Sequence, residues 1–283
     1  MSNIILVDSS YTSFYRFFAT LRWFSLSNME LYKKYKDDPT FDWSLEPIFF
    51  EKYKKMYLDS IKTLVGSIVY QDSTIVFCLD SPQESLWRKE LSECYKGNRV
   101  DLSLKNNFIP TFRYTYNELI PSFVATYNFI HMIKIPRMEA DDIIALSVKY
   151  IRYRRPNLNV YVVSGDNDFL QLGYDKLYFA DYKKISTRPQ IFQLSKEEAK
   201  EALKQKIING DCSDNIPSIF PKDEKLNNKM KKIIKENNSE LKKYLAGNTK
   251  AMKQYLHNKK MISFRYIPKN LRKPIYSAIK KLV

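Results

Sequence analysis

Nine carboxylates are placed in this sequence where they could share one site. Three apolar segments, residues 4–8, 75–80 and 160–166, each end on an aspartate, namely Asp8, Asp80 and Asp166. The other six acids are Glu139, Asp141, Asp142, Asp168, Asp211 and Asp214. Carboxylates that gather in one place repel each other unless hard cations neutralise them. Carboxylate oxygens suit Mg²⁺ or Mn²⁺, and two such ions can clamp a phosphoryl displacement and activate water. The pattern therefore predicts a divalent-metal enzyme.

The elements that must position these acids follow from the same segments. Short apolar segments rich in β-branched residues are typical of buried strands. Long stretches with helical periodicity separate them, so we expect an α/β fold with one mostly parallel sheet flanked by helices. Parallel strands end along one edge, where open α/β sheets bind ligands. Asp8, Asp80 and Asp166 should meet at that edge, with the other six acids close by.

Two of the acids have an explanation that needs no metal. Residues 139–153 are predicted to form a helix, and Asp141 and Asp142 in its first turn would interact favourably with the helix dipole. That explanation does not account for acids at three strand ends. Asp181, after the apolar segment 177–180, repeats the strand-end pattern, but no second acid or motif accompanies it, so we leave it out of the predicted site.

The composition points to a polyanionic substrate. The chain has 283 residues and a net charge of +16, from 47 Lys and Arg against 31 Asp and Glu. A basic surface around an acidic pocket fits a nucleic acid held over metal ions, with basicity for solubility alone as the alternative. The chain has only two histidines, and its three cysteines show no metal-type pairing, so zinc chemistry and Ser-His catalysis have few candidate residues. The same cysteine usage suggests a reducing compartment. Because no GxxxxGK loop is present, hydrolysis of a nucleic acid phosphodiester is a better fit than NTP-driven chemistry.

No segment predicts membrane insertion. The most apolar longer stretch, residues 119–136, contains Asn128, His131 and Lys134, and residues 1–7 lack the basic start and cleavage site of a signal peptide. We expect a monomer in the cytoplasm, which would be the host cytoplasm if a phage encodes it.

Two regions of the chain are rich in positive charge, the first with aromatic residues and the second with a helical pattern. Residues 82–118 interleave cations with aromatic residues, which suits phosphate contacts and base stacking. The alternative for this region is an ordinary amphipathic helix and loop. From Lys222 onward the chain is rich in lysine and helical in pattern.

Five sets of motifs occur in an order and at spacings that resemble the structure-specific 5′-nuclease (flap endonuclease) superfamily, over roughly residues 4–217. They are Leu6-Val7-Asp8-Ser9-Ser10; Leu79-Asp80 with Trp87-Arg88-Lys89-Glu90-Leu91 and Tyr95-Lys96-Gly97-Asn98-Arg99; Glu139-Ala140-Asp141-Asp142; Ser164-Gly165-Asp166-Asn167-Asp168-Phe169-Leu170-Gln171-Leu172; and Gly210-Asp211-Cys212-Ser213-Asp214-Asn215-Ile216-Pro217. Within the superfamily, Trp87-Arg88 and residues 261–268 resemble the ribonuclease H type of T-even bacteriophages.

The resemblance implies a PIN-like 5′-nuclease fold in two domains. Residues 1–187 would form the catalytic domain, with a helical arch at about 82–118. Residues 188–283 would form a helical duplex-binding domain that contributes Asp211 and Asp214 to the site. The implied activity is that of a 5′-to-3′ exonuclease and flap endonuclease on DNA and RNA·DNA duplexes, which removes RNA primers in phage DNA replication. Single-strand binding protein and a sliding clamp are the implied protein partners.

The resemblance also assigns roles to residues. One Mg²⁺ would be surrounded by Asp8, Asp80, Glu139 and Asp141, and a second by Asp142, Asp166, Asp168, Asp211 and Asp214, with Mn²⁺ as a substitute. Arg88, Lys96 and Arg99 would contact the scissile region, Tyr95 would stack on a base, and Arg16 is a phosphate-contact candidate. Catalysis would rest on Asp8, Asp80, Arg88, Lys96, Glu139, Asp141 and Asp166. Lys222, Lys229, Lys231 and Lys232 are the expected duplex-binding lysines.

One departure from the family pattern lies at residues 218–222, which contain no glycine where the family usually has a glycine-rich turn between two helices. Two rival functions remain at this point. A PIN-like ribonuclease shares strand-end carboxylates, but small members lack the arch and the segment 210–217. A non-catalytic, basic DNA-binding replication protein requires the ordered acids to be incidental.

Overall fold

The chain forms a mostly parallel sheet, as predicted. The structure, a computed structural model, describes residues 2–97, 108–220 and 226–283. The strands are β1 (Asn3–Asp8), β2 (Ser73–Leu79), β3 (Ile130–Lys134), β4 (Asn159–Val163), β5 (Leu177–Ala180) and β6 (Ile191–Phe192). They are arranged in the order β3-β2-β1-β4-β5-β6. All neighbouring pairs are parallel except β5 with β6.

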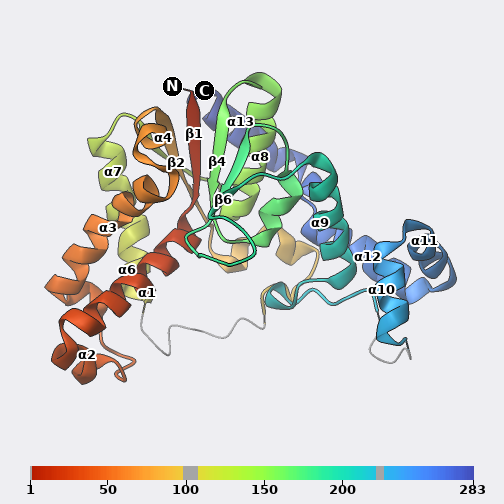
Figure 1. The fold of residues 1–283 in the computed structure, drawn as a ribbon, viewed down its shortest axis with the longest axis horizontal. Helices are drawn as coiled ribbons and strands as arrows, with labels where there is room; N and C mark the ends of the chain where they lie inside the picture. Colours follow the sequence, from red (N-terminus) through yellow and green to blue (C-terminus); the bar gives the residue numbers. More distant parts are fainter. Residues whose placement is uncertain (1, 98–107, 221–225) are drawn as a thin grey trace.

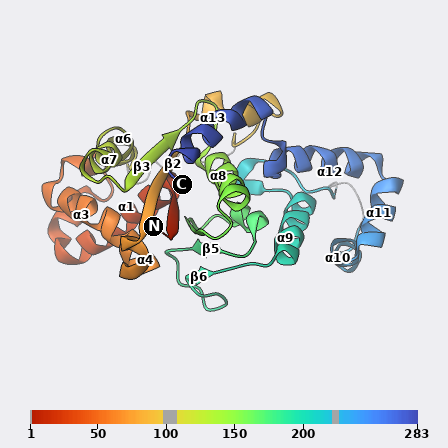
Figure 2. The ribbon, with the colours of Figure 1, turned by 90° about the horizontal axis from the view of Figure 1, so that it is seen from above.

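Helices cover both faces of this sheet (Figures 1 and 2). Because successive strand side chains point to opposite faces, Ile5 and Val7 of β1 join one core and Ile4 and Leu6 join the other. The first core is closed by α1 (Ser9–Ser27) and α3 (Pro47–Val65), and the second by α8 (Ala140–Arg154) and α13 (Lys269–Lys280). Strands buried on both faces explain why their sequences read as unbroken apolar runs.

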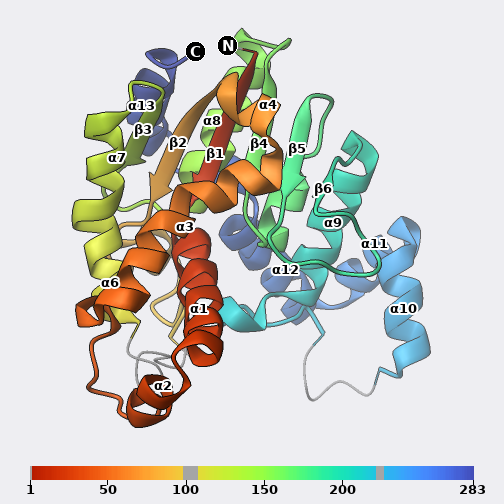
Figure 3. The ribbon, with the colours of Figure 1, turned by 60° about the vertical axis from the view of Figure 1, so that its left-hand side comes forward.

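The remaining helices extend this layered body. On the α3 side they are α2 (Met29–Tyr35), α4 (Ser67–Gln71), α6 (Ile109–Tyr114), a π-helical turn (Thr115–Leu119) and α7 (Ile120–Thr126). Beyond the edge strand β6, α9 (Lys196–Asn209) leads to α10 (Asn228–Glu236), α11 (Asn238–Gly247) and α12 (Thr249–Ile262). Figure 3 shows α10 and α11 standing away from the sheet. They share a small core of their own, with residues such as Ile219, Ile234 and Leu245.

The predicted domain boundary needs a correction at the C-terminal end. Phe264, Leu271 and Ile279 are buried in the same core as α8 and β1, so the chain returns to the sheet after α12. The small outer core joins the end of α9, residues 219–220, α10, α11 and the start of α12, whereas the end of α12 packs with Leu86 and Tyr95. Helix α13 completes the sheet's cover.

The predicted helical arch is only partly described. Its first section holds two short 3-10 segments, Gln83–Ser85 and Trp87–Glu90, and its last section is α6 followed by the π-helical turn. Trp87 and Tyr95 are buried, so residues 87–96 pack against the body instead of standing free. Residues 98–107, including Arg99, lie outside the described residues. Within the described ranges, no helix is long and apolar enough to cross a membrane.

Candidate active site

The sheet order explains why acids distant in sequence come together. From β1 the chain continues to β2 and β3 on one side and then crosses to β4 on the other side of β1. Such switch points of open α/β sheets form crevices at the strand carboxyl ends. Asp8 ends β1, Asp80 follows β2 and Asp166 follows β4. These three and Glu139 and Asp141 line one pocket of about 780 Å³. The predicted convergence is therefore observed for these residues.

The first two strand-end aspartates are held by the helices that follow or adjoin them. Asp8 is itself the N-cap of α1, since its Oδ1 accepts from the backbone N–H of Tyr11 at 3.0 Å, and its Oδ2 accepts from Ser164 Oγ at 2.8 Å. Asp80 Oδ1 accepts from the backbone N–H of Ala140, in the first turn of α8, at 2.8 Å. Its Oδ2 accepts from Ser10 Oγ. Free N–H groups at helix starts favour anionic partners, so these carboxylates have little rotational freedom.

The electrostatics of this pocket favour an added cation. Burial and the charge of Asp80 raise the pKa of Asp8 to about 7. Burial and the charges of Asp166 and Asp8 raise the pKa of Asp141 well above its usual range. These carboxyls resist ionising together while no cation is present, as expected for like charges that share a buried site.

Glu139, the N-cap of α8, stands at the border of the pocket with three partners of its own. Its carboxylate accepts from Arg88 at 2.7 Å and from Tyr95 Oη at 3.0 Å, and pairs with Lys96. Burial alone would raise the pKa of Glu139, but Lys96 and Arg88 hold it below the usual value. Glu139 is thus ionised and already neutralised by this chain's own cations.

Asp142 and Arg88 do not match their predicted roles. Arg88 is 4 % exposed and meets both Asp142 oxygens, at 2.8 and 3.0 Å, while its Nε donates to the Met261 carbonyl at 2.9 Å. Asp142 is fully buried and also accepts from Trp87 Nε1 at 2.7 Å. A guanidinium enclosed in this way cannot reach a phosphate. The Asp142 carboxylate is closed to solvent and is already paired with Arg88 through both of its oxygens, so it does not face a metal ion. The pair forms a buried structural clamp that joins residues 87–88, α8 and the end of α12.

Tyr95 also departs from the prediction. Its ring is 3 % exposed and its hydroxyl bridges Glu139 and Asp214, with the Asp214 contact at 3.1 Å. Since no face is accessible, Tyr95 cannot stack on a base. It links the two sets of acids instead. Lys96, by contrast, lines the pocket.

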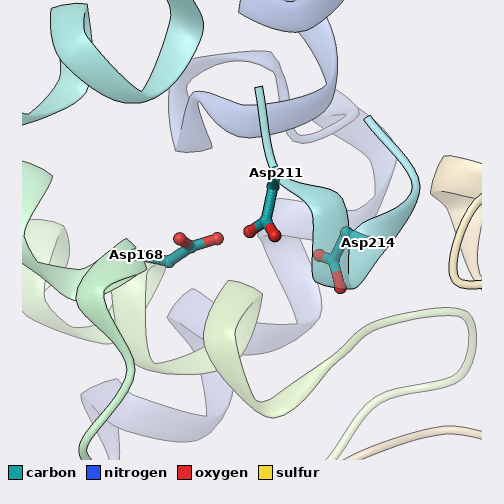
Figure 4. A group of neighbouring side chains, drawn as sticks. All are labelled: Asp168, Asp211 and Asp214. Carbon is teal, nitrogen blue, oxygen red and sulfur yellow. The ribbon is translucent and has the colours of Figure 1, made fainter. Parts of the chain in front are cut away.

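A second group of acids lies beside the pocket. Figure 4 shows Asp168, Asp211 and Asp214 with their carboxylates facing a common space, and one oxygen from each lies within 4.8 Å of the others. Lys206, from the last turn of α9, pairs with Asp168 and reaches Asp211 at 2.8 Å. Although burial acts to raise the pKa of Asp211, hydrogen bonds from Lys206 and Ser213 bring it below the usual value.

A glycine shapes the turn that presents this second group. Gly210 has φ +70°, and a Cβ there would lie 2.3 Å from the Ile216 carbonyl oxygen. Asp211 and Ile216 exchange two backbone hydrogen bonds of 2.8 Å across the turn. Only glycine permits this approach, so Gly210 fixes where Asp211 and Asp214 point.

The predicted DNA-binding cations are scattered. Arg16 is half-buried, with its guanidinium 4.7 Å from the Tyr15 ring centre and 5.2 Å from that of Tyr182. Lys229, Lys231 and Lys232 lie on α10, and Lys222 lies outside the described residues.

The sequence reasoning missed Lys206 and the hydroxyl partners Ser10 and Ser164. A single lysine near a helix end carries no signal in a chain with so many lysines. The two serines do lie inside recognised motifs, but each contacts an acid from a different motif: Ser10 donates to Asp80 and Ser164 donates to Asp8.

Comparison with known proteins agrees with this geometry. A family model described as the 5′-3′ exonuclease, N-terminal resolvase-like domain, matches residues 3–204. Ribonuclease H of Enterobacteria phage T4 is 26% identical over 176 residues, which are 62% of this chain and 56% of that protein. This chain thus aligns with little more than half the length of that relative.

Solved structures from bacteriophage T5 share the fold. A flap endonuclease complex with DNA and metal ions superimposes with a TM-score of 0.62 at 17% identity, over 99% of this chain and 98% of that chain. A T5 5′-exonuclease with bound zinc gives 0.61 at 18% identity, over 99% and 98%. Because the family model covers more than half of the sequence, this chain belongs to the 5′-3′ exonuclease family with the N-terminal resolvase-like domain.

Proposed function

We propose that this protein is a metal-dependent nuclease that cuts phosphodiesters at 5′ ends and flaps of DNA and RNA·DNA duplexes. The observation that carries the proposal is the gathering of eight carboxylates, from strand ends, α8 and the turn after α9, along one edge of the sheet. The positive net charge of +16 supports a polyanionic substrate. The family membership supports the same chemistry.

The residues fit two divalent cations. Oxygen donors alone, without sulfur or imidazole, suit Mg²⁺, with Mn²⁺ as a substitute. Asp8, Asp80, Glu139 and Asp141 would hold one ion, and Asp168, Asp211 and Asp214 the other, with Asp166 between the two groups. The raised pKa values of Asp8 and Asp141 support this assignment, since a cation would relieve the repulsion that keeps those groups protonated. When bound, the ions would supply charge neutralisation and activation of the attacking water.

The chain itself would contribute positioning and positive charge. Each group of acids has one lysine beside it. Lys96 pairs with Glu139, and Lys206 pairs with Asp168 and Asp211. Once cations neutralise the carboxylates, each ammonium becomes available to a phosphate oxygen. We assign Lys96 to the scissile phosphate, because a cation fixed there stabilises the charge that develops in the transition state. Arg88 is excluded from that role by its burial.

The biological role that we propose is removal of RNA primers during phage DNA replication. A single-strand binding protein and a sliding clamp are the partners that the family resemblance implies. The lysines of α10 would hold duplex phosphates away from the reacting centre.

The experiment is cleavage of a 5′-labelled flap, a blunt RNA·DNA duplex and a single-stranded RNA, each with Mg²⁺ and with EDTA. We expect flap and duplex to be cut only with Mg²⁺, with Asp59→Asn, an exposed change on α3, as a control of full activity. Cutting of the single strand alone would favour a PIN-like ribonuclease. Binding of all substrates without cutting would favour a non-catalytic DNA-binding protein.

A further inference from the structure

A second pocket, separate from the carboxylates, has an apolar floor and a basic rim. It has a volume of about 350 Å³ and lies between α8, the 3-10 segment Asn167–Leu172, α9 and residues 263–265. Leu146, Leu172 and Leu203 supply its floor. The volume is at the small end of the range for ligand pockets.

Five cations surround this floor, and no acidic side chain lines it. They are Lys149, Arg152, Lys196, Lys200 and Arg265. All five are exposed. Within the described part of the chain, the ion pair found for this set is the loose contact of Lys200 with exposed Glu197, at 3.7 Å. So much unneutralised charge around an apolar hollow fits an anionic, amphipathic ligand.

The pocket also contains a buried polar atom without a partner. Tyr174 is 6 % exposed, and its hydroxyl makes no hydrogen bond within the described residues. Burial raises the pKa of Tyr174 to about 12, so the hydroxyl keeps its proton and is available as a donor. A buried hydroxyl left unsatisfied costs free energy, which a ligand with an acceptor at this place would recover.

The form of the pocket favours a peptide over a nucleic acid. The Tyr174 ring already has the Arg152 guanidinium 5.0 Å from its centre, so that face is closed to a nucleobase. Branched aliphatic side chains, which make up most of the floor, accept another side chain better than a flat base, for which proteins use open aromatic faces. Lys149 and Arg152 on α8, and Lys196 and Lys200 on α9, lie at spacings that put each pair on one helix face, about 5–6 Å apart. Alternate residues of an extended peptide lie about 6.6–6.8 Å apart, close to that repeat.

We infer that this pocket is a docking site for an acidic peptide segment of a partner protein, which inserts one bulky apolar side chain between α8 and α9. Carboxylates on either side of that anchor would meet the two pairs of cations, and an acceptor of the peptide would take the Tyr174 hydroxyl. The site is distinct from the proposed nuclease centre, although the 3-10 segment that carries Asp168 forms one of its walls.

The test uses a fluorescein-labelled peptide in which aspartates flank a single phenylalanine, followed by fluorescence anisotropy on the full chain. Lys149→Glu with Lys200→Glu should weaken binding by about tenfold or more, as expected when two charge contacts are reversed. Lys55→Glu with Lys62→Glu, on exposed positions of α3, makes the same charge change elsewhere and should have little effect. Equal affinity for both double variants would overturn the proposal. So would equal binding of a peptide whose phenylalanine is replaced by aspartate.

Tyr174→Phe gives a second readout that does not depend on charge. We expect this variant to melt at or above the wild-type temperature, because it removes an unsatisfied buried hydroxyl, and yet to bind the peptide more weakly. Loss of thermal stability would mean that the hydroxyl already has a partner and is not reserved for a ligand.

A single-stranded oligonucleotide and the flap substrate separate this site from the nuclease. Lys149→Glu with Lys200→Glu should leave flap cleavage and oligonucleotide affinity close to those of the Lys55→Glu, Lys62→Glu control. An equal loss of oligonucleotide and peptide affinity would identify the pocket as a nucleic acid surface and overturn the peptide assignment. Failure of the nuclease proposal would appear instead as absent cleavage in the wild type.

Discussion

The two groups of acids at the sheet edge are built in different ways. Asp8, Asp80, Glu139 and Asp141, here the strand-edge group, come from strand ends and the start of α8. The first two are fixed by backbone amides, and Glu139 by buried partners. Asp168, Asp211 and Asp214, the turn group, come from a 3-10 segment and a glycine turn, and Lys206 pairs with the first two of them. The first group is held by the core of the sheet, and the second by local turn geometry.

This difference also sets the electrostatics of the two groups. Without an added cation, the strand-edge carboxyls Asp8 and Asp141 have raised pKa values, because burial and their neighbours oppose ionisation. Asp211 of the turn group has a lowered pKa, because Lys206 and Ser213 donate to its ionised form. Within the strand-edge group, Asp8 and Asp141 therefore have the strongest need for a metal ion, whereas Glu139 and the turn group are partly neutralised by cations of the chain itself.

The largest expected effect is on catalysis. Asp80→Asn should lower the single-turnover cleavage rate by roughly a thousandfold, since it removes charge from a rigid, preorganised site. Asp211→Asn should lower it by roughly 10–100-fold, because the turn group is more open and Lys206 is already present. Rates at saturating enzyme on a 5′ flap would measure both, with Asp59→Asn as the control. Equal losses for the two variants would remove the distinction between the groups.

The next effect concerns the clamp beside the strand-edge group. Arg88→Met leaves Asp142 buried without its partner, so the free energy of unfolding should fall by about 3 kcal/mol. Arg88→Lys keeps the charge but not the two-pronged contact, so it should restore stability only in part. Urea denaturation would measure both variants. An Arg88→Met protein with wild-type stability and reduced DNA affinity would instead support the DNA contact predicted from the sequence.

The third effect is a pH dependence of stability in the absence of metal. The pKa of Asp8 is raised in the folded state from 3.8 to about 7, so its stabilising contribution is complete below about pH 4 and is lost as the pH rises to about 7. The loss should be on the order of 4 kcal/mol. Thermal melts in EDTA should show the wild-type melting temperature falling as the pH rises through this range. The melting temperature of Asp8→Asn should depend less on pH. Mg²⁺ should raise the melting temperature more at pH 8 than at pH 5.

The turn group supplies a control, because the pKa of Asp211 is shifted in the opposite direction to that of Asp8. The pKa of Asp211 is lowered by its partners, so its contribution is present above pH 3.8 and is lost only as the pH falls below that value. Asp211→Asn should therefore leave the profile between pH 4 and 7 unchanged. A flattened profile in that window for Asp211→Asn would show that the two groups titrate as one.

The smallest effect is expected far from both groups, on α10. Lys229 is exposed and forms no ion pair within the described residues, whereas Lys231 packs 5.8 Å from the Phe220 ring centre and Lys232 lies 3.9 Å from Glu236. Lys229→Ala should flatten the salt dependence of duplex binding by about one unit of slope, and Lys232→Ala by less. Superimposable plots of affinity against salt for wild type and Lys229→Ala would mean that α10 does not contact DNA.

Much of the fold could be predicted because its signals are local. The strand segments ending on Asp8 and Asp80 were recognisable as buried β-strands, and their parallel order followed from the helices between them. The start of α9 carries a local signal of the same kind, since Ser195 and Glu198 form a capping box with both reciprocal hydrogen bonds. Gly210 follows the last residue of that helix as its C-cap. In each case the residues that determine the element lie within a few positions of one another.

The sequence by itself determined that Asp8, Asp80 and Asp166 would meet, because strand ends of a parallel sheet share one edge whatever the loops do. It could not determine which acids would face a metal ion and which a cation of the chain. Asp141 and Asp142 are neighbours of the same type, yet one lines the pocket and the other is enclosed by Arg88 and Trp87. That separation depends on side-chain direction around a helix and on the return of the chain at Met261, a contact across 173 residues. Only tertiary packing decides burial and partners of this kind, because the free energy of a charged group depends on everything that surrounds it.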